Sequence, residues 1–192
     1  MGIPAGQVTD LSPLRGLTQL TDLTVDGQGS FSTAIISDLS PLSGLTGLKT
    51  LTLNDDHLVD LSPLAGLDLT SLDISNNQVT TVAPLARLAK LTTLHADGNQ
   101  ITDLSPLDGI AGLTTNTMLR QTATMAVSAG QAFTLPAVPR AGDTLTWAVT
   151  SGQVDVSGDQ ATISSPGTAT LTWTNNVPTT TTFTGTLTVT AN

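Results

Sequence analysis

The chain of 192 residues contains no cysteine and no glutamate. Without cysteine there is neither a disulfide framework nor a thiolate metal site, although this constrains the cellular compartment only weakly. All 15 acidic residues are therefore aspartates. Glutamate is a good helix former, whereas Asp, Thr, Ser, Gly and Pro favour caps, turns or strands. The composition thus predicts short elements joined by many turns.

Positive charge is also scarce, with 6 Lys and Arg against the 15 aspartates. Residues 1–116 hold 12 Asp and 4 Lys or Arg, and residues 117–192 hold 3 and 2. The negative field is therefore concentrated on the first region. Nucleic-acid binding draws its affinity from cations that neutralise phosphates, so we exclude nucleic acid as a partner.

No apolar run approaches the 18 residues that a membrane-spanning helix needs, and the N-terminus lacks a basic segment followed by an apolar stretch. We expect a soluble segment without membrane insertion, whose longer parent could still carry a signal peptide or an anchor. No nucleophile elbow, phosphate-binding glycine loop or zinc-ligand spacing occurs either. We therefore expect no enzyme, no catalytic residues and no cofactor.

What dominates the sequence is an internal repeat. The segment VTDLSPLRGLTQLTDLTVDGQ recurs four times in modified form, and its proline is spaced by 28, 22, 21 and 22 residues. The unit is thus 22 residues, with a six-residue insertion around residues 29–33 that carries Phe31. This phenylalanine either decorates a binding face or tucks against the first turn. The five prolines are Pro13, Pro41, Pro63, Pro84 and Pro106.

Apolar residues occupy fixed columns within the repeat, one of which is Leu11, Leu39, Leu61, Val82 and Leu104. Stacked turns would bury each column as one continuous core. In the LSPL motif the serines can cap a short helix that the proline begins. Leu-x-Leu has strand periodicity, and the polar residue three positions after it can satisfy backbone groups of the turn. Those polar residues are Gln28, Asp56, Asn77, Asn99 and Gln121.

The pattern IxxLSPLxxLxxLxxLxLxxN, over about residues 8–121, resembles the repeats of the internalin family, which are leucine-rich-repeat proteins on the surface of Gram-positive bacteria or secreted by them. The resemblance implies a solenoid of short parallel strands with a 3-10 or irregular convex side. Unlike the family, the chain has no helical cap before Val8. That difference implies truncation, a substitute cap from residues 1–7, or self-association through the uncapped end.

After Leu113 the repeat fails, and Asn116 stands where a strand leucine is expected. We therefore divide the chain into a leucine-rich-repeat domain at 1–116 and a second domain at 117–192. The second part has about seven short alternating segments separated by Gly, Pro, Ser, Asn and Asp turns, which predicts a β-sandwich with Trp147 and Trp173 in its core. The internalin resemblance implies an immunoglobulin-like domain fused directly to the last repeat.

In a leucine-rich-repeat arc, residues that alternate with the buried leucines line the concave side and form a ready binding surface. The resemblance implies that a protein, from a host or another bacterial surface, binds there. However, the twelve outward positions contain no aromatic residue and no Arg, the types that dominate protein hot spots. The predicted binding residues are Thr24, Asp26, Thr52, Asn54, Asp73, Ser75, His95 and Asp97.

Other interpretations of these residues stay open. Several aspartates with His95 could form a calcium site, but a solvated column explains them more simply because Ca²⁺ demands many oxygens. His57 and His95 occupy different repeat positions, so we interpret them as surface histidines and predict no metal site. A glycan partner is also conceivable. The leading hypothesis is an adhesion module of a bacterial secreted or surface protein, and the alternative is a structural spacer or self-assembly segment without a specific small ligand.

Overall fold

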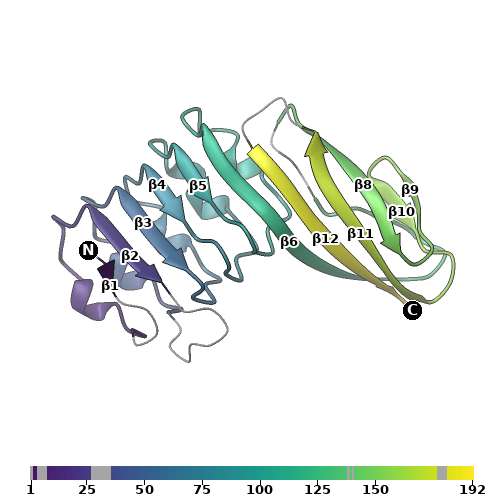
Figure 1. Cartoon of the computed structure of the whole chain (residues 1–192), viewed down its shortest axis with the longest axis horizontal. Coiled ribbons are helices and arrows are strands. Elements are labelled where there is room, and N and C mark those ends of the chain that lie inside the picture. The colour runs from purple at the N-terminus through teal and green to yellow at the C-terminus, as the bar shows by residue number, and fades with distance from the viewer. Residues whose placement is uncertain (1, 4–7, 27–35, 138, 140, 177–180) are drawn as a thin grey trace.

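The computed structural model describes residues 2–3, 8–26, 36–137, 139, 141–176 and 181–192. The repeat region alternates strands with short 3-10 helices, and every later element is a strand (Figure 1). In order the elements are β1 (Gly2–Ile3), η1 (Ser12–Leu14), β2 (Asp22–Asp26), η3 (Ser40–Leu42), β3 (Thr50–Asn54), η4 (Ser62–Leu64), β4 (Ser71–Asp73), η5 (Ala83–Arg87), β5 (Thr93–His95), η6 (Ser105–Leu107), β6 (Thr115–Val127), β7 (Ala132–Thr134), β8 (Thr144–Ser151), β9 (Asp155–Ser157), β10 (Gln160–Thr162), β11 (Gly167–Asn176) and β12 (Thr181–Ala191).

Strands β2 to β6 pair in parallel, each with the strand of the next repeat. The pairing joins equivalent positions, so Leu23 lies opposite Leu51, which lies opposite Leu72. These leucines and the equivalent Leu94 are fully buried. Together they form the single hydrophobic spine that the leucine spacing predicts, and the solenoid is confirmed.

The predicted columns are buried in every coil except the first, where Leu17 is exposed and Leu20 is half-buried. Leu45, at the equivalent position in the second coil, is fully buried, but Leu17 in the first coil is 45% exposed. Leu17 lies in the first of the coils, and no coil precedes it among the described residues. At this end Gly2 and Ile3 pair in parallel with Thr24 and Val25 of β2 and add one strand to the sheet. Phe31 and Gln28 lie outside the described residues.

The LSPL motif forms a 3-10 helix in each coil where it occurs, but its serines are not caps, and that prediction is wrong. The residue before each serine is the N-cap, and it makes no side-chain cap hydrogen bond. Instead the aspartate two residues earlier accepts a hydrogen bond from the serine backbone N–H, at 2.8 Å for Asp60 Oδ1 and Ser62. The aspartate carboxylate lies two residues before this N–H and readily bonds to it, whereas a serine cap would have to bond to a backbone N–H two or three residues after the serine. The other pairs are Asp10 with Ser12, Asp38 with Ser40 and Asp103 with Ser105.

The amides of Asn77, Asn99 and Gln121 are buried and bond to backbone groups of the turn, as their position in the repeat predicts, and Asp56 at the equivalent position is also buried. The Asn77 amide oxygen accepts from the backbone N–H groups of Asp56 and Leu58, at 3.1 and 2.9 Å. The Asn77 Nδ2 donates to the carbonyl oxygens of Leu53 and Ile74, at 2.8 and 2.9 Å. Because these partners lie in two successive coils, one amide fastens each coil to the next. Asn99 and Gln121 make equivalent bonds one and two coils further on.

The solenoid sheet does not stop where the repeat fails. Strand β6 pairs in parallel with β5 through Thr115 to Thr117, and it pairs in parallel with β12 over most of its length. Strand β12 pairs with β11, and β11 pairs with β8. The result is one nine-stranded sheet in the order β1-β2-β3-β4-β5-β6-β12-β11-β8, which runs the length of the molecule (Figure 1). The proposed boundary at residues 116 and 117 thus falls inside a strand.

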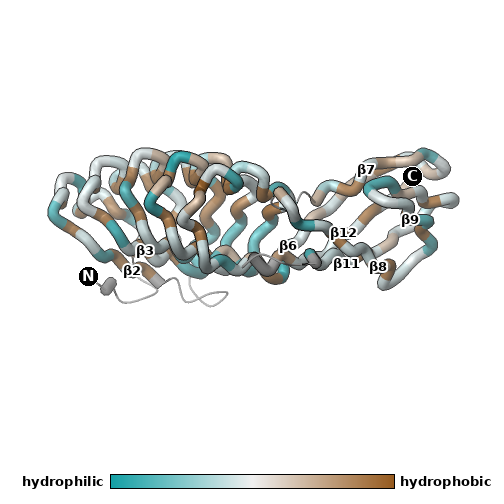
Figure 2. The backbone as a smooth tube through the Cα atoms, turned by 90° about the horizontal axis from the view of Figure 1, so that it is seen from above, coloured by the Kyte–Doolittle hydropathy of each residue, from teal (hydrophilic) through white to brown (hydrophobic). Residues whose placement is uncertain are grey.

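Seven strands from β6 onward form two layers, which Figure 2 shows edge on, with β7 and β9 on one side and β12, β11 and β8 on the other. Strands β7, β10 and β9 make a separate three-stranded antiparallel sheet. Trp173 is buried between the layers, and its ring lies 5.3 Å from Trp147 and 5.8 Å from Phe183 between centroids. Trp147 itself is only half-buried. Within the described residues, no helix is long and apolar enough to cross a membrane.

Candidate binding face

The predicted binding residues form rows across the polar face of the sheet. Strand pairing places Thr24 opposite Thr52, Thr52 opposite Asp73, and Asp73 opposite His95. Thr24 is exposed and the other three are half-buried. Neighbouring strands in a sheet lie about 4.8 Å apart, so the row is a continuous strip of short polar groups. Because the opposite side of each strand is locked in the core, this strip is held rigidly.

Asn54, Ser75 and Asp97 form a second row at the carboxyl ends of the strands, where they bond to their neighbours. Asn54 Nδ2 donates to Asp73 Oδ2 at 3.4 Å, and the Ser75 hydroxyl donates to Asp73 Oδ1 at 2.7 Å. Asp97 Oδ1 accepts from the backbone N–H of Leu119 at 2.7 Å. The side chain of Asp26, also predicted for this row, lies outside the described residues. These bonds fix the carboxylates in place before any partner arrives.

The two histidines have different surroundings. His95 Nδ1 lies 2.9 Å from the Thr117 hydroxyl of β6, so this nitrogen is occupied and Nε2 is left as the atom with which the ring can meet a partner. His57 is exposed in the turn after β3, with φ of 58°. Over the part of the chain that the structure describes, no three His, Asp, Glu or Cys side chains are grouped so that they could hold a metal ion.

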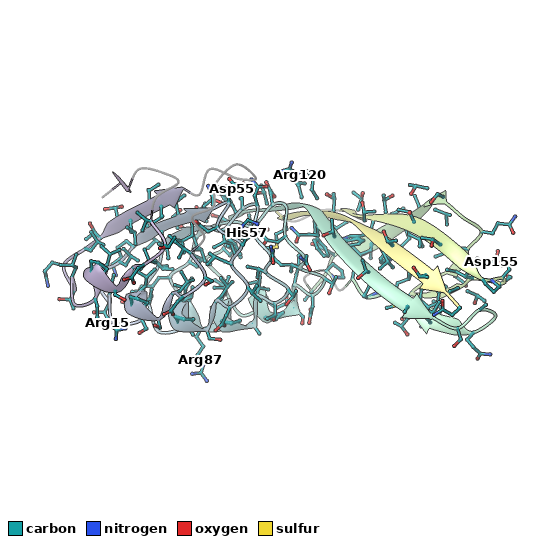
Figure 3. The ribbon with its side chains drawn as sticks, turned by 90° about the horizontal axis from the view of Figure 1, so that it is seen from below. Arg15, Asp55, His57, Arg87, Arg120 and Asp155 are labelled. Carbon is teal, nitrogen blue, oxygen red and sulfur yellow. The ribbon has the colours of Figure 1, made fainter. Side chains whose placement is uncertain are left out.

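The predicted binding positions include three aspartates and no Lys or Arg, while Arg120 lies at the rim of the face. Hydrogen bonds from Thr21 and Thr50 lower the pKa of Asp22, so this carboxylate at the edge of the face stays ionised. Arg15 and Arg87 lie on the 3-10 side of the solenoid, away from Asp55 and Arg120 (Figure 3).

The sequence prediction missed how far this face extends. Thr115 and Thr117 continue the rows into β6 opposite Thr93 and His95. At Arg120 the strand bulges, with φ of 56°, and the exposed guanidinium lies 3.4 Å from Asn76 Oδ1. After the bulge, alternating threonines of the second region lie on the same side of the sheet. The Thr-x-Thr spacing in the sequence indicates a polar strand face in the second region, but only the strand pairing shows that both regions share one face. The described threonines of the continuation are Thr122, Thr124, Thr144, Thr146, Thr150, Thr168, Thr170, Thr172, Thr174, Thr184, Thr186, Thr188 and Thr190.

Comparison with known proteins places the repeat among leucine-rich repeats. Residues 68–109 match a family model described as leucine-rich repeats in two copies. The internalin InlF of Listeria monocytogenes is 36% identical with a TM-score of 0.52, and the match covers 59% of this chain and 32% of that one. Internalin C2 of the same organism is 39% identical with a TM-score of 0.48, covering 59% of this chain and 57% of that one. No curated protein matches.

A further match extends over both regions. The functional domain of InlJ from Listeria monocytogenes aligns with 96% of this chain and 50% of its own, at 18% identity and a TM-score of 0.56. At that identity the likeness shows the fold alone. The cysteine ladder described for InlJ has no counterpart in this cysteine-free chain. The chain spans from 32% to 57% of the length of these three solved structures.

Proposed function

We propose that this chain, an internalin-like leucine-rich-repeat protein, is a non-catalytic binding module of a bacterial secreted or surface protein. In this proposal the concave face of the repeat sheet binds a protein. The observation that carries the proposal is the row of Thr24, Thr52, Asp73 and His95, held in register on strands whose other side is fully buried. A preorganised surface loses little conformational freedom on binding, which favours affinity.

The chemistry of the face supports a basic protein surface as the partner. Its carboxylates at Asp22, Asp73 and Asp97 are already oriented by hydrogen bonds, and Asp22 is held in the ionised form by a lowered pKa. Charge-assisted bonds to Arg or Lys would add specificity without moving the sheet. Arg120 at the rim supplies one residue type that is common in hot spots, whereas the predicted positions lack both Arg and aromatic residues.

The second region is proposed to be an immunoglobulin-like domain over residues 117–192 that stiffens and spaces the arc. Its support is the grouping of strands, because β8, β11 and β12 lie in one sheet while β7, β10 and β9 form the other. This matches the C, F, G and B, E, D strands of the immunoglobulin fold. The similarity to Listeria internalins supports a location outside the cell or at its surface.

Binding of the fluorescently labelled chain to animal and bacterial cells tests the proposal. The variant Asp73→Ala/His95→Ala removes two neighbours from the centre of the row, and both side chains are half-buried rather than core residues. We expect cell binding to fall at least tenfold, as for a loss of about 1.4 kcal/mol or more in an interface centre. The matched control Arg15→Ala/Arg87→Ala alters the 3-10 side and should leave binding unchanged.

Treatment of the cells separates the classes of partner. Protease treatment should abolish binding, whereas removal of surface glycans should leave it intact. Binding that survives protease but not glycan removal would contradict a protein partner and favour a glycan. If the chain binds no cell type, or if both variants bind as well as the parent, the alternative of a structural spacer or self-assembly segment is favoured.

A further inference from the structure

Strand β8 is unlike the other strands that end a sheet in the described part of the chain. The nine-stranded sheet ends at β1 and β8, and the three-stranded sheet ends at β7 and β9. Strands β1, β7 and β9 have only two or three residues, whereas β8 has eight. Short edges are one way in which proteins prevent strands of other molecules from pairing with them. Strand β8 lacks that protection.

The sequence of β8 also lacks the other usual protections. TLTWAVTS contains no charged residue and no proline, and its pairing with β11 is regular from Thr144 to Val149. The register between the two strands shifts once, near the end of β8. Leu171 lies opposite Val149 and Thr170 lies opposite Ser151, so Thr150 is an extra residue in β8. An edge that is long, uncharged and regular is a template for a further strand. It lies at the end of the sheet furthest from β2, away from the aspartate-rich repeats (Figure 1).

Apolar surface is exposed along the same edge. Leu145, Trp147 and Val149 point to the core side of β8, yet Trp147 is only half-buried and Val149 is 40% exposed. Beside them is a hollow of about 290 Å³ that Leu135, Leu145 and Trp147 help to line. The edge of the facing sheet adds Val156, which is 36% exposed. Among the described residues the sandwich is therefore open between β8 and β9, and a strand added to β8 would cover this opening.

We propose that β8 pairs antiparallel with β8 of a second copy of this chain, so that two sheets join into one. The partner is argued from the pattern of β8 itself. In the existing pair with β11, tryptophan lies opposite tryptophan and Thr146 lies opposite Thr174. The outer edge of β8 presents the same alternation, with threonine and alanine on the polar face and apolar residues on the other. A second β8 supplies the matching alternation.

Symmetry fixes the register that this pairing can take. Opposed residues must point to the same face, and a two-fold axis makes the pairing reciprocal. An axis through Trp147 satisfies both conditions and uses most of the strand. It places Leu145 opposite Val149 of the second copy and Thr146 opposite Ala148 of the second copy. Trp147 of the second copy then covers the opening, and no aspartate meets another, because Asp143 falls opposite Ser151.

Sedimentation of the whole chain between about 10 µM and about 1 mM tests the proposal, since a single strand pair makes a small interface of modest affinity. We expect a reversible shift from monomer to dimer. The variant Thr146→Lys/Ala148→Lys would place lysines opposite each other twice, and it should leave the chain monomeric at every concentration. The matched control Thr122→Lys/Thr124→Lys lies on the same face of the interior strand β6 and should dimerise as the parent does.

The absence of native cysteine gives a second test that does not depend on the lysine variant folding. Chains with Thr146→Cys and chains with Ala148→Cys are oxidised separately and as a mixture. In the proposed register only the mixture brings two cysteines directly opposite, within the reach of a disulfide. We expect the mixture to form covalent dimer several-fold faster than either variant alone. A chain that stays monomeric throughout, or equal crosslinking in all three samples, overturns the proposal.

Discussion

The repeat region and the region after β6 bury apolar residues on the same side of one sheet, but different additional contacts stabilise their strands. In the repeats each strand has three to five residues, and buried amides such as Asn77 join successive coils. In the second region the strands of the shared sheet have eight to thirteen residues, and the buried Trp173 ring packs against Phe183 and Gly185. The repeats thus add hydrogen bonds of buried amides to their leucine spine, whereas the second region adds packing of large rings against a glycine.

The largest expected effect comes from removing one of those amides. Asn77→Ala leaves backbone groups of Asp56, Leu58, Leu53 and Ile74 without their buried partner. Because each unpaired buried group costs about 1–3 kcal/mol, we expect the free energy of unfolding to fall by about 3 kcal/mol or more. Urea unfolding followed by circular dichroism measures it. The neighbour Gln78 is exposed, so Gln78→Ala is the control.

The same variant tests whether the two regions unfold together. Both tryptophans lie beyond β6, so their fluorescence reports on the second region alone. Since β6 belongs to both parts of the sheet, we expect Asn77→Ala to shift the fluorescence transition and the circular dichroism transition by the same amount of urea. A fluorescence midpoint that stays at the parental value would mean that the regions are independent.

A packing change in the second region should have a smaller effect. A Cβ added at Gly185 would overlap the indole ring of Trp173, which is fully buried between the layers. Gly185→Ala is therefore expected to lower the free energy of unfolding by about 1–3 kcal/mol, through displacement of the ring. Denaturation monitored by tryptophan fluorescence measures it. Gly109→Ala is the control because a Cβ there meets no atom within 4 Å.

The junction between the regions should become more stable when a polar residue is removed. Asn116 is 2% exposed, and neither of its amide atoms has a hydrogen-bond partner among the described residues. Its position in the repeat is otherwise a leucine, such as Leu94 in the strand beside it. Asn116→Leu should raise the free energy of unfolding by about 1–2 kcal/mol, because an unpaired buried amide is replaced by an apolar group. A lower melting temperature than the parent's would contradict this account of the junction.

The smallest expected effect is a loss of stability in acid that arises from aspartates of the repeats. Hydrogen bonds from Ser12, Ser40 and Ser62 lower the pKa of Asp10, Asp38 and Asp60 below the ordinary value of 3.8. A lowered pKa in the folded state stabilises the protein above the unfolded value, and this contribution is lost as the pH falls through the folded value. Stability should therefore decline below about pH 4. The triple alanine variant should show a shallower decline in chemical denaturation between about pH 5 and about pH 2.5.

Most of the repeat region could be predicted because its signal is repeated five times. Leu51 and Leu72 occupy the same column of the sequence, and they lie opposite each other in the sheet. The role of Asn77 followed from its place after the strand, where backbone groups need a partner. The serine caps were wrongly predicted because Asp60 and Ser62 are both good turn formers, and spacing alone does not say which side chain bonds to which N–H.

The shared strand could not be predicted, since its two halves carry different patterns. Asn116 breaks the leucine column and Arg120 introduces a bulge. The sequence therefore indicates the end of one domain and the start of another, although a single strand spans both. Pairing of β6 with β12 joins residues that are more than 60 positions apart, and no local pattern reports it. For the same reason the rows of the binding face were predicted only as far as His95 and Asp97. Whether the predicted residues bind a partner stays a prediction.

The parallel pairing of β6 with β12 has a mechanical consequence. One end of β6 leads into the solenoid, and β12 runs in the same direction toward Ala191. A tension pulling the solenoid away from Ala191 would therefore slide the two strands along each other. In this geometry all the backbone hydrogen bonds between β6 and β12 bear the force together, and they do not break one after another. Tension between the solenoid and Ala191 would therefore load the β6–β12 pair in shear.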